Sequence, residues 1–296
     1  MSEPERDPHT GRLTTGHDWN GIKELNSPVP KLVWFFLILT TVIAVVMWVL
    51  LPTWPTGRDY TKGILNTNQY KVLDASLEAG AKQRAPWTHT FETTGFDELQ
   101  ADPAAMLIVR ENGRRMFEDN CAMCHGRDGQ GGRGFPDLTD DQWLWGGSPE
   151  DIMETLRVGV NNKHDEARLS QMLAFGRDGI LDTNQRRQVV SYVQSLSEHD
   201  DASHVAALKP ADIEAGRDVF AMQCATCHGV DGKGLPTMGA PNLTDDFWLY
   251  GGRRSDIEET VYGGRQGVMP FWEDRLDEVD RKILTLYVLD MGERQK

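Results

Sequence analysis

Two short stretches decide how this sequence folds: CAMCHGRDGQGG, residues 121–132, and CATCHGVDGKG, residues 224–234. Each contains two cysteines separated by two residues and followed at once by a histidine, and together they use all four cysteines of the 296-residue chain. A set of structural disulfides would leave this repeated spacing unexplained. A redox dithiol or a zinc site would explain the cysteine pairs, but not the histidine that directly follows both of them.

The two motifs lie inside a longer internal repeat. ENGRRMFEDN precedes the first motif and EAGRDVFAMQ precedes the second, and the segments PDLTDDQWLWGG (136–147) and PNLTDDFWLYGG (241–252) follow them. Each copy closes with a helical pattern, at 183–196 and at 277–291. Matching segments in the same order indicate two homologous domains.

Within each copy we expect short helices separated by Gly, Pro and Asp loops, because alternating strand patterns are scarce. The sequence therefore predicts an all-α fold with domain 1 at 106–199, a linker at 200–210 and domain 2 at 211–296. A glycine stands four residues before a phenylalanine near the start of each copy, at Gly113 and Gly216. This spacing favours a close crossing of the opening helix with the closing Tyr-Val helix of each copy.

C-x-x-C-H is the attachment signal of haem c. The two cysteine sulfurs add to the two vinyl groups of the porphyrin, and the histidine then places an imidazole nitrogen on the iron. We therefore predict two covalently bound haem c groups, each with its iron, as cofactors. The expected attachment and ligand residues are Cys121, Cys124 and His125 in the first copy and Cys224, Cys227 and His228 in the second.

A methionine in each copy is the expected sixth ligand of the iron. Met172 lies 47 residues after His125, and Met269 lies 41 residues after His228. Thioether ligation raises the reduction potential and fills the site against oxygen and peroxide. The competing candidates are Met123, Met153, Met238 and His164. The repeat favours Met172 with His125 and Met269 with His228, although a crossed pairing between the copies stays open.

The LTDDxWLxGG segment of each copy allows two interpretations. Its aromatic residues are Trp143, Trp145, Trp248 and Tyr250. These rings either line a haem or belong to an ordinary core. The acidic pairs at 140–141 and 245–246 resemble a general-acid pair, but in front of a helix they are more typical of caps. With both irons six-coordinate and every cysteine used, we expect this chain to transfer single electrons and to contain no catalytic residues.

The segment LVWFFLILTTVIAVVMWVLL, residues 32–51, carries no charge. As a helix it would span about 30 Å, the thickness of a bilayer core. A buried core helix is the alternative, but this hydrophilic chain offers little to surround one. A polar arm at 1–31 and the length of the apolar run argue against a cleaved signal peptide, so we predict a transmembrane anchor.

Residues 52–105 are expected to be a connector with short helices, including a helical patch at 69–81, and His89 is expected to lie on the surface. The chain has 45 acidic and 31 basic residues, a formal net charge of −14. This excess argues against nucleic acid as a partner and suits either plain solubility or a basic protein partner. Charges on the two sides of the apolar segment do not decide its orientation.

The segment TTGHDWNGIKELNSPVPKLVWFF, residues 14–36, resembles the N-terminal signature of the CcoP/FixP family, the dihaem subunit III of cbb3-type cytochrome c oxidases. The matching positions are Gly16, His17, Trp19, Gly21, Ile22, Glu24, Asn26, Pro28 and Pro30. YTKGILNTNQ at 60–69 and both LTDDxWLxGG segments also resemble the family. The resemblance therefore covers almost the whole chain.

The resemblance implies one N-terminal transmembrane helix followed by two tandem class I cytochrome c domains. It implies four partners: the haem–copper catalytic subunit, the monohaem cytochrome c subunit, a donor cytochrome c and the lipid bilayer. Electrons would pass through the two haems towards the oxygen-reducing subunit in aerobic or microaerobic respiration. This chain would be a relay within that proton-pumping oxidase and would itself lack the oxygen-reducing site.

The orientation follows from the cofactor, because bacteria attach haem c outside the cytoplasmic membrane. The haem domains are therefore expected in the periplasm, on a single-pass anchor in the inner membrane, with the arm at 1–31 in the cytoplasm. Two alternatives remain. The chain could be a membrane-anchored dihaem cytochrome that serves another dehydrogenase or reductase, or it could be a dihaem peroxidase.

Overall fold

The computed structural model describes residues 5–196 and 208–295. The chain divides into two compact units, Met1–Gln83 and Arg84–Lys296. The linker expected at 200–210 lies outside the described residues except for its last three positions.

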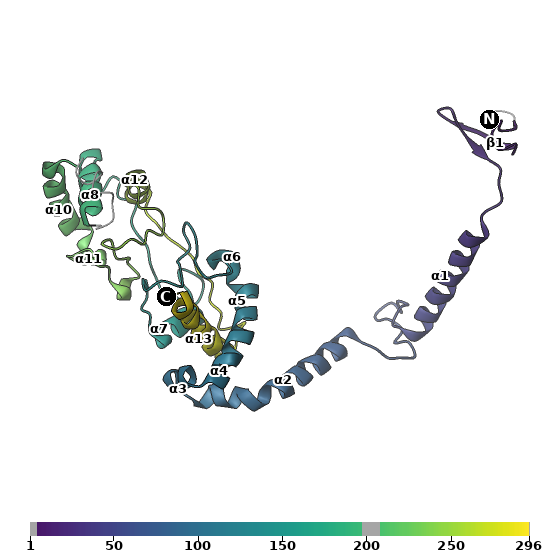
Figure 1. Cartoon of the computed structure of the whole chain (residues 1–296), viewed down its shortest axis with the longest axis horizontal. Coiled ribbons are helices and arrows are strands. Elements are labelled where there is room, and N and C mark those ends of the chain that lie inside the picture. Colours follow the sequence, from purple (N-terminus) through teal and green to yellow (C-terminus); the bar gives the residue numbers. More distant parts are fainter. Residues whose placement is uncertain (1–4, 197–207, 296) are drawn as a thin grey trace. The chain divides into compact units, whose positions relative to one another are not determined.

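The first unit begins with an antiparallel hairpin of β1 (Thr14–Trp19) and β2 (Ile22–Leu25), near the N-terminus in Figure 1. Asn20 and Gly21 form the turn, with φ angles of +56° and +89°. Asn-Gly is the residue pair that best adopts these left-handed values, and the resulting turn matches the twist of the two strands. The polar arm expected at 1–31 therefore contains a small sheet, which is a minor addition to a mostly helical chain.

The apolar segment forms helix α1 (Lys31–Leu50), the one helix of the described residues that is long and apolar enough to cross a membrane. None of its residues is buried against the rest of the protein. This exposure argues against the core-helix alternative, since a core helix would be covered on all sides. The span predicted at 32–51 is confirmed to within one residue at each end.

Helix α2 (Gln69–Thr93) begins where the helical patch at 69–81 is expected but is much longer, so the expectation of only short helices is wrong there. Trp87 and Phe91 lie four residues apart on one face of its last turns, with ring centroids 5.8 Å apart. Phe91 is 1 % exposed and belongs to a core of the second unit. His89, between them in sequence, lies on the exposed face as expected.

Most of the second unit consists of short helices. They are α3 (Phe96–Ala101), α4 (Pro103–Ile108), the π-helical turn η1 (Val109–Gly113), α5 (Arg114–Asn120), α6 (Ala122–His125), α7 (Pro149–Val158), α8 (Thr183–Leu196), α10 (Pro210–Gln223), α11 (Ala225–His228), the 3₁₀ turn η2 (Pro236–Met238), α12 (Arg254–Gly263) and α13 (Glu278–Gln295). They surround two hydrophobic cores. We call the helices and loops around one core lobe 1 (α3–α7 and α13) and those around the other lobe 2 (α8 and α10–α12).

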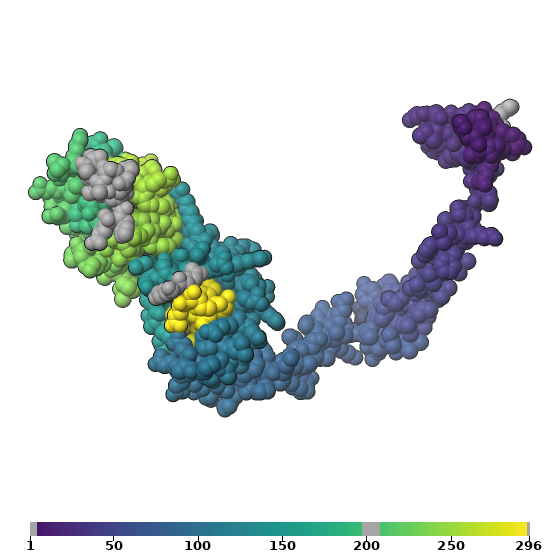
Figure 2. Space-filling view, viewed as in Figure 1, coloured from purple at the N-terminus to yellow at the C-terminus, as the bar shows by residue number. Residues whose placement is uncertain are grey.

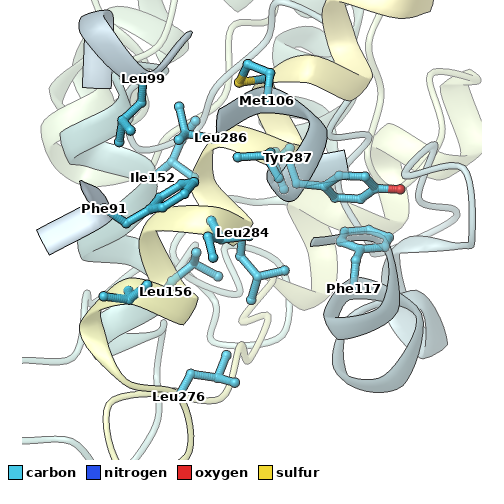
Figure 3. Packing of buried hydrophobic residues seen from close by; sticks show 14 of the residues in the cluster. Phe91, Leu99, Met106, Phe117, Ile152, Leu156, Leu276, Leu284, Leu286 and Tyr287 are labelled. Carbon is cyan, nitrogen blue, oxygen red and sulfur yellow. The ribbon is translucent and has the colours of Figure 1, made fainter. Parts of the chain in front are cut away.

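Each core combines residues from both copies of the repeat. In lobe 1, Phe117 of the first copy packs against Tyr287 of α13, from the second copy, with ring centroids 5.8 Å apart (Figure 3). In lobe 2, Phe220 of the second copy packs against Tyr192 of α8, from the first copy, at 5.2 Å. The closing helices have therefore exchanged places, as Figure 1 shows for α13 beside α4 and α5, and for α8 beside α10.

The glycines at the helix crossings explain why the closing helices come so near. A Cβ on Gly113 would lie 2.6 Å from Cβ of Tyr287, and a Cβ on Gly216 would lie 2.1 Å from the backbone oxygen of Gln188. Both distances are too short for any residue larger than glycine. The predicted close crossing is thus confirmed, but each opening helix crosses the closing helix of the other copy.

An ion pair between a half-exposed arginine and a buried aspartate also joins the two copies in lobe 1. Arg110 donates from Nε and Nη2 to Oδ1 of Asp290 on α13, at 3.0 and 2.7 Å, and from Nε to Oδ2 at 3.2 Å. The Asp290 side chain is 3 % exposed, so its charge depends on these donors and on Arg294. Figure 2 shows the C-terminal residues of α13, in yellow, next to blue atoms from earlier in the chain.

Candidate haem sites

The first C-x-x-C-H motif folds as a single helical turn. Helix α6 begins directly after Cys121, whose backbone oxygen accepts from the N–H groups of Cys124 and His125 at 3.1 and 3.0 Å. The second motif folds in the same way, with α11 beginning after Cys224. One turn of helix therefore holds both sulfurs and the imidazole of each motif close together.

A backbone carbonyl orients each motif histidine. Nδ1 of His125 lies 3.0 Å from the oxygen of Pro136, and Nδ1 of His228 lies 3.0 Å from the oxygen of Pro241. A histidine that donates from Nδ1 to a carbonyl presents Nε2 as a neutral metal ligand. Burial lowers the pKa of both histidines, which keeps the rings uncharged at neutral pH.

The four cysteines are present as separate thiols and form no disulfide. Burial raises the pKa of Cys121 and of Cys224 to about 11, with a smaller contribution from the second cysteine of each motif. No group of three or more His, Cys, Asp or Glu side chains in the described ranges could hold a metal ion, so the cysteine pairs are not assembled into a zinc site there. The arrangement fits haem attachment, with two thiols and one neutral imidazole for each group.

Both candidate methionine ligands lie in the lobe of the opposite motif. Met269 packs against the core of lobe 1, which Cys121 also contacts. Met172 packs against the core of lobe 2, which Cys224 also contacts. This placement is the reverse of the pairing within each copy that the repeat favours, and it matches the crossed pairing.

Two antiparallel backbone pairs bring the methionines into these positions. Val160 and Met269 exchange hydrogen bonds, with N–O distances of 2.9 and 3.0 Å, and Met172 and Arg265 exchange them at 2.8 and 3.1 Å. Val160 and Arg265 each follow the glycine that ends a helix, α7 or α12, so the two pairs are equivalent in the repeat. Beyond each of these helices the chain leaves its own lobe, and its methionine enters the other.

The rival ligands are placed less favourably. Nε2 of His164 lies 2.8 Å from Oε2 of Glu273, and Nδ1 accepts from a backbone N–H, so both ring nitrogens are already engaged. Met123 and Met238 are 96 % and 46 % exposed. Met153 is partly buried on α7.

Three family models match the chain in order. The N-terminal domain of cytochrome oxidase-cbb3, FixP, matches residues 11–58, cytochrome c matches 110–197, and cytochrome c oxidase, cbb3-type, subunit III matches 211–288. A FixP subunit from Bradyrhizobium is 41 % identical over 288 residues, which cover 97 % of each chain. A CcoP subunit from Azospirillum brasilense is 38 % identical over 301 residues, covering 99 % of each, and one from Cereibacter sphaeroides is 41 % identical over 281 residues, covering 94 % of each. The chain belongs to the CcoP/FixP family of cbb3-type cytochrome c oxidase subunits.

Several predictions from the sequence are thereby confirmed. The fold is mostly helical, with an N-terminal helix that can cross the membrane and two cytochrome c domains. A CcoP/FixP subunit carries covalently bound haem c, and two groups suit two cytochrome c domains. It is a membrane-anchored part of an oxidase complex. A haem at each motif would supply a one-electron couple, and the cysteine and histidine residues described above are the ones that could hold it.

The His17 run, which carries the CcoP/FixP resemblance, forms the N-terminal hairpin. Glu24 on β2 accepts from Nε1 of Trp19 at 3.1 Å and from Oγ1 of Thr15 at 3.2 Å, and Nδ1 of His17 lies 3.4 Å away. The bond from Trp19, followed by those from His17 and Thr15, lowers the pKa of Glu24. The Glu24 carboxylate therefore links β2 to β1, and this contact accounts for the spacing between His17, Trp19 and Glu24 in the signature.

The aromatic residues of the LTDDxWLxGG segments divide into two kinds. Trp143 packs against the core of lobe 1, and Trp248 packs against the core of lobe 2. Trp145 and Tyr250 instead lie beneath arginine guanidinium groups. The first ring of each segment therefore packs against a core. The second ring contacts a positively charged guanidinium group.

The prediction that the acidic pairs cap helices is wrong. Oδ1 of Asp140 accepts from the N–H of Gln142 at 2.9 Å, and this bond closes a turn inside the loop. Helix α7 begins later and is capped by Ser148. Burial raises the pKa of Asp140 to about 6 and shifts that of Asp245 in the same direction.

Proposed function

We propose that this subunit passes single electrons through its two haems, from a donor cytochrome c towards the monohaem and haem–copper subunits of the oxidase. The haem lobes stand in the periplasm, because bacteria attach haem c there, and the arm at 1–31 lies in the cytoplasm. Oxygen reduction and proton pumping belong to the catalytic subunit. The membership of the chain in the CcoP/FixP family supports this role.

We further propose that the ligand sets of the two irons are crossed. The haem of lobe 1 takes Cys121, Cys124, His125 and Met269, and the haem of lobe 2 takes Cys224, Cys227, His228 and Met172. The observation that carries this assignment is the exchange of the methionine-bearing segments between the lobes. Each electron-transfer unit then combines segments of both copies, so the ranges 106–199 and 211–296 describe copies of the sequence and not folded lobes.

The exchange has a consequence for electron transfer. Because each lobe contains the closing helix of the other copy, the lobes cannot separate without opening both cores. The two haems therefore keep one spacing during turnover. A methionine thioether on each iron would also occupy its sixth position, which suits a relay and would keep peroxide from the metal.

The function is tested with the purified oxidase complex, rapidly mixed with reduced cytochrome c while haem absorbance and oxygen consumption are recorded. We expect Met269→Ala and Met172→Ala each to lower the potential of one haem and to slow oxygen consumption with cytochrome c. A small-molecule reductant that reaches the catalytic subunit directly should restore the rate. Unchanged turnover in both variants would contradict the relay.

Two further measurements address the alternatives. Rapid peroxide turnover by the isolated wild-type subunit would favour the dihaem peroxidase, and co-purification with a different dehydrogenase or reductase would favour the other relay.

The membrane orientation has its own test. Protease added to spheroplasts should release haem-staining fragments. Protection of the haem lobes in intact spheroplasts would contradict the periplasmic orientation.

A further inference from the structure

Arg265 lies beside the proposed iron ligand of lobe 2. The N–H of Met172 donates to the oxygen of Arg265 at 2.8 Å, and the N–H of Arg265 donates back at 3.1 Å. Residues directly opposite each other in an antiparallel pair project their side chains to the same face. The Arg265 side chain therefore leaves the backbone on the side from which Met172 would reach the iron.

The guanidinium of Arg265 is held in place but keeps an unused donor. Its Nε donates to Oγ1 of Thr260 at 3.0 Å, and its central carbon lies 4.4 Å from the ring centroid of Tyr250. Nη2 is buried, and no acceptor in the described part of the chain forms a hydrogen bond with it. Oε1 of Glu259 is 3.6 Å away, beyond hydrogen-bond distance. A buried cationic donor without an acceptor is unfavourable, so this atom calls for an anionic ligand.

A haem in lobe 2 supplies such an anion. The propionates lie on the porphyrin edge opposite the thioether bonds, so with Cys224 and Cys227 at one edge they point away from the motif. We propose that Arg265 binds a propionate of this haem and thereby raises its reduction potential, an inference that rests on the crossed ligand sets. A guanidinium suits a carboxylate, and a positive charge near the ring favours the reduced iron.

Lobe 1 differs at the equivalent position. There Val160, an apolar residue, pairs with Met269. The arginine nearby, Arg168, has its guanidinium carbon 5.2 Å from the ring centroid of Trp145 and donates from Nη1 to the oxygen of Trp145 at 2.9 Å. Its Nη2 donates to the backbone oxygen of Asp151 at 3.1 Å. Both Nη atoms of Arg168 thus bond to backbone carbonyls, so within the described residues Arg265, and not Arg168, keeps a buried Nη atom without an acceptor.

The test is optical potentiometry of the full-length subunit in detergent, at several pH values, fitted with two one-electron steps. Arg265→Gln should favour the oxidised form of one haem about tenfold, which is 59 mV for a one-electron step. The potential of that haem should also fall with rising pH, because a propionate without its cation titrates nearer to neutrality. Arg265→Lys should retain most of the wild-type potential.

Three controls make the result decisive. Glu259→Gln tests whether the ion pair at 3.6 Å explains the effect, and Arg168→Gln should leave the affected step unchanged. Met172→Ala identifies the step that belongs to lobe 2. No shift in Arg265→Gln, an equal shift in Glu259→Gln, or loss of the Met–iron charge-transfer band without rescue by lysine would overturn the proposal.

If the crossed ligand sets were wrong, the redox titrations would differ from those expected if only the propionate contact were missing. In that case Met172→Ala and Arg265→Gln would displace different redox steps, whereas a missing propionate contact leaves Arg265→Gln without effect on either step. The haem content, two per chain by pyridine haemochrome, confirms that each variant is fully loaded. A variant that keeps both haems and both charge-transfer bands reports on the propionate alone.

Discussion

Replacing Tyr287 by alanine tests the exchange of closing helices at the level of single helices. Tyr287 is 5 % exposed, belongs to the second copy of the repeat, and packs in lobe 1 against Phe117 and over Gly113. Removing a buried aromatic side chain costs about 3–5 kcal/mol. We expect a loss near 3 kcal/mol, because part of the Tyr287 ring lies over Gly113, which has no side chain that could lose a contact.

About 3 kcal/mol corresponds to roughly a hundredfold change in an opening equilibrium. Hydrogen exchange followed by mass spectrometry resolves where this change falls. In Tyr287→Ala, amides of α5 (Arg114–Asn120) should exchange about a hundredfold faster, whereas those of α10 (Pro210–Gln223) should change little. The matched variant Tyr192→Ala should do the reverse. If Tyr287→Ala loosened α10 and spared α5, the exchange of helices would be refuted.

Three further predictions follow from the same structure. Asp140→Asn should flatten the pH dependence of the urea midpoint between about pH 4 and pH 7. The raised pKa of Asp140 means that the native protein holds a proton that the unfolded chain releases, so the stability of the wild type falls as pH rises through about 6. An unchanged slope in the variant would contradict this. Phe91→Ala should lower the free energy of unfolding of the second unit by about 3–5 kcal/mol. The control Tyr70→Ala, on the exposed part of α2, should change it by less than about 0.5 kcal/mol. Equal effects of the two variants in urea titrations would show that α2 is not part of the core. Met172→Ala in the full-length chain should keep two haems but let carbon monoxide bind one reduced iron, and two closed irons would show that Met172 is not a ligand.

The sequence predicts the haem motifs and the closing helices well, because both depend on local spacing. It does not predict which closing helix packs against which opening helix. Gly113 and Gly216 are equivalent in the repeat, as are Tyr192 and Tyr287, so either pairing satisfies the pattern. The choice depends on how the chain leaves α7 and α12, a property of the three-dimensional arrangement.

The connections to the methionines contain one trace of this asymmetry. The stretch from Val160 to Met172 is eight residues longer than the stretch from Arg265 to Met269. That difference breaks the repeat where the segments cross, and it places His164 in the longer connection. In the sequence alone, this insertion is indistinguishable from an ordinary loop.

Two local features of the sequence indicate elements beyond those predicted above. Asn20-Gly21 between two residues of high strand propensity, Trp19 and Ile22, is a strong hairpin signal, although the surrounding strands are short. In α2 the Trp87–Phe91 spacing indicates a helix, but the proline just before it favours a break. Burial of Phe91 in the core outweighs that local preference.

The central claim is that the methionines are exchanged between the haems, and one measurement tests it directly. In a chain with Cys121→Ala and Cys124→Ala, only the haem of the second motif remains attached. Adding Met172→Ala should abolish its Met–iron charge-transfer band and let carbon monoxide bind the reduced iron, whereas adding Met269→Ala should leave both properties unchanged. If Met269→Ala opened this iron and Met172→Ala did not, each haem would take the methionine of its own copy, and the crossed assignment would be wrong.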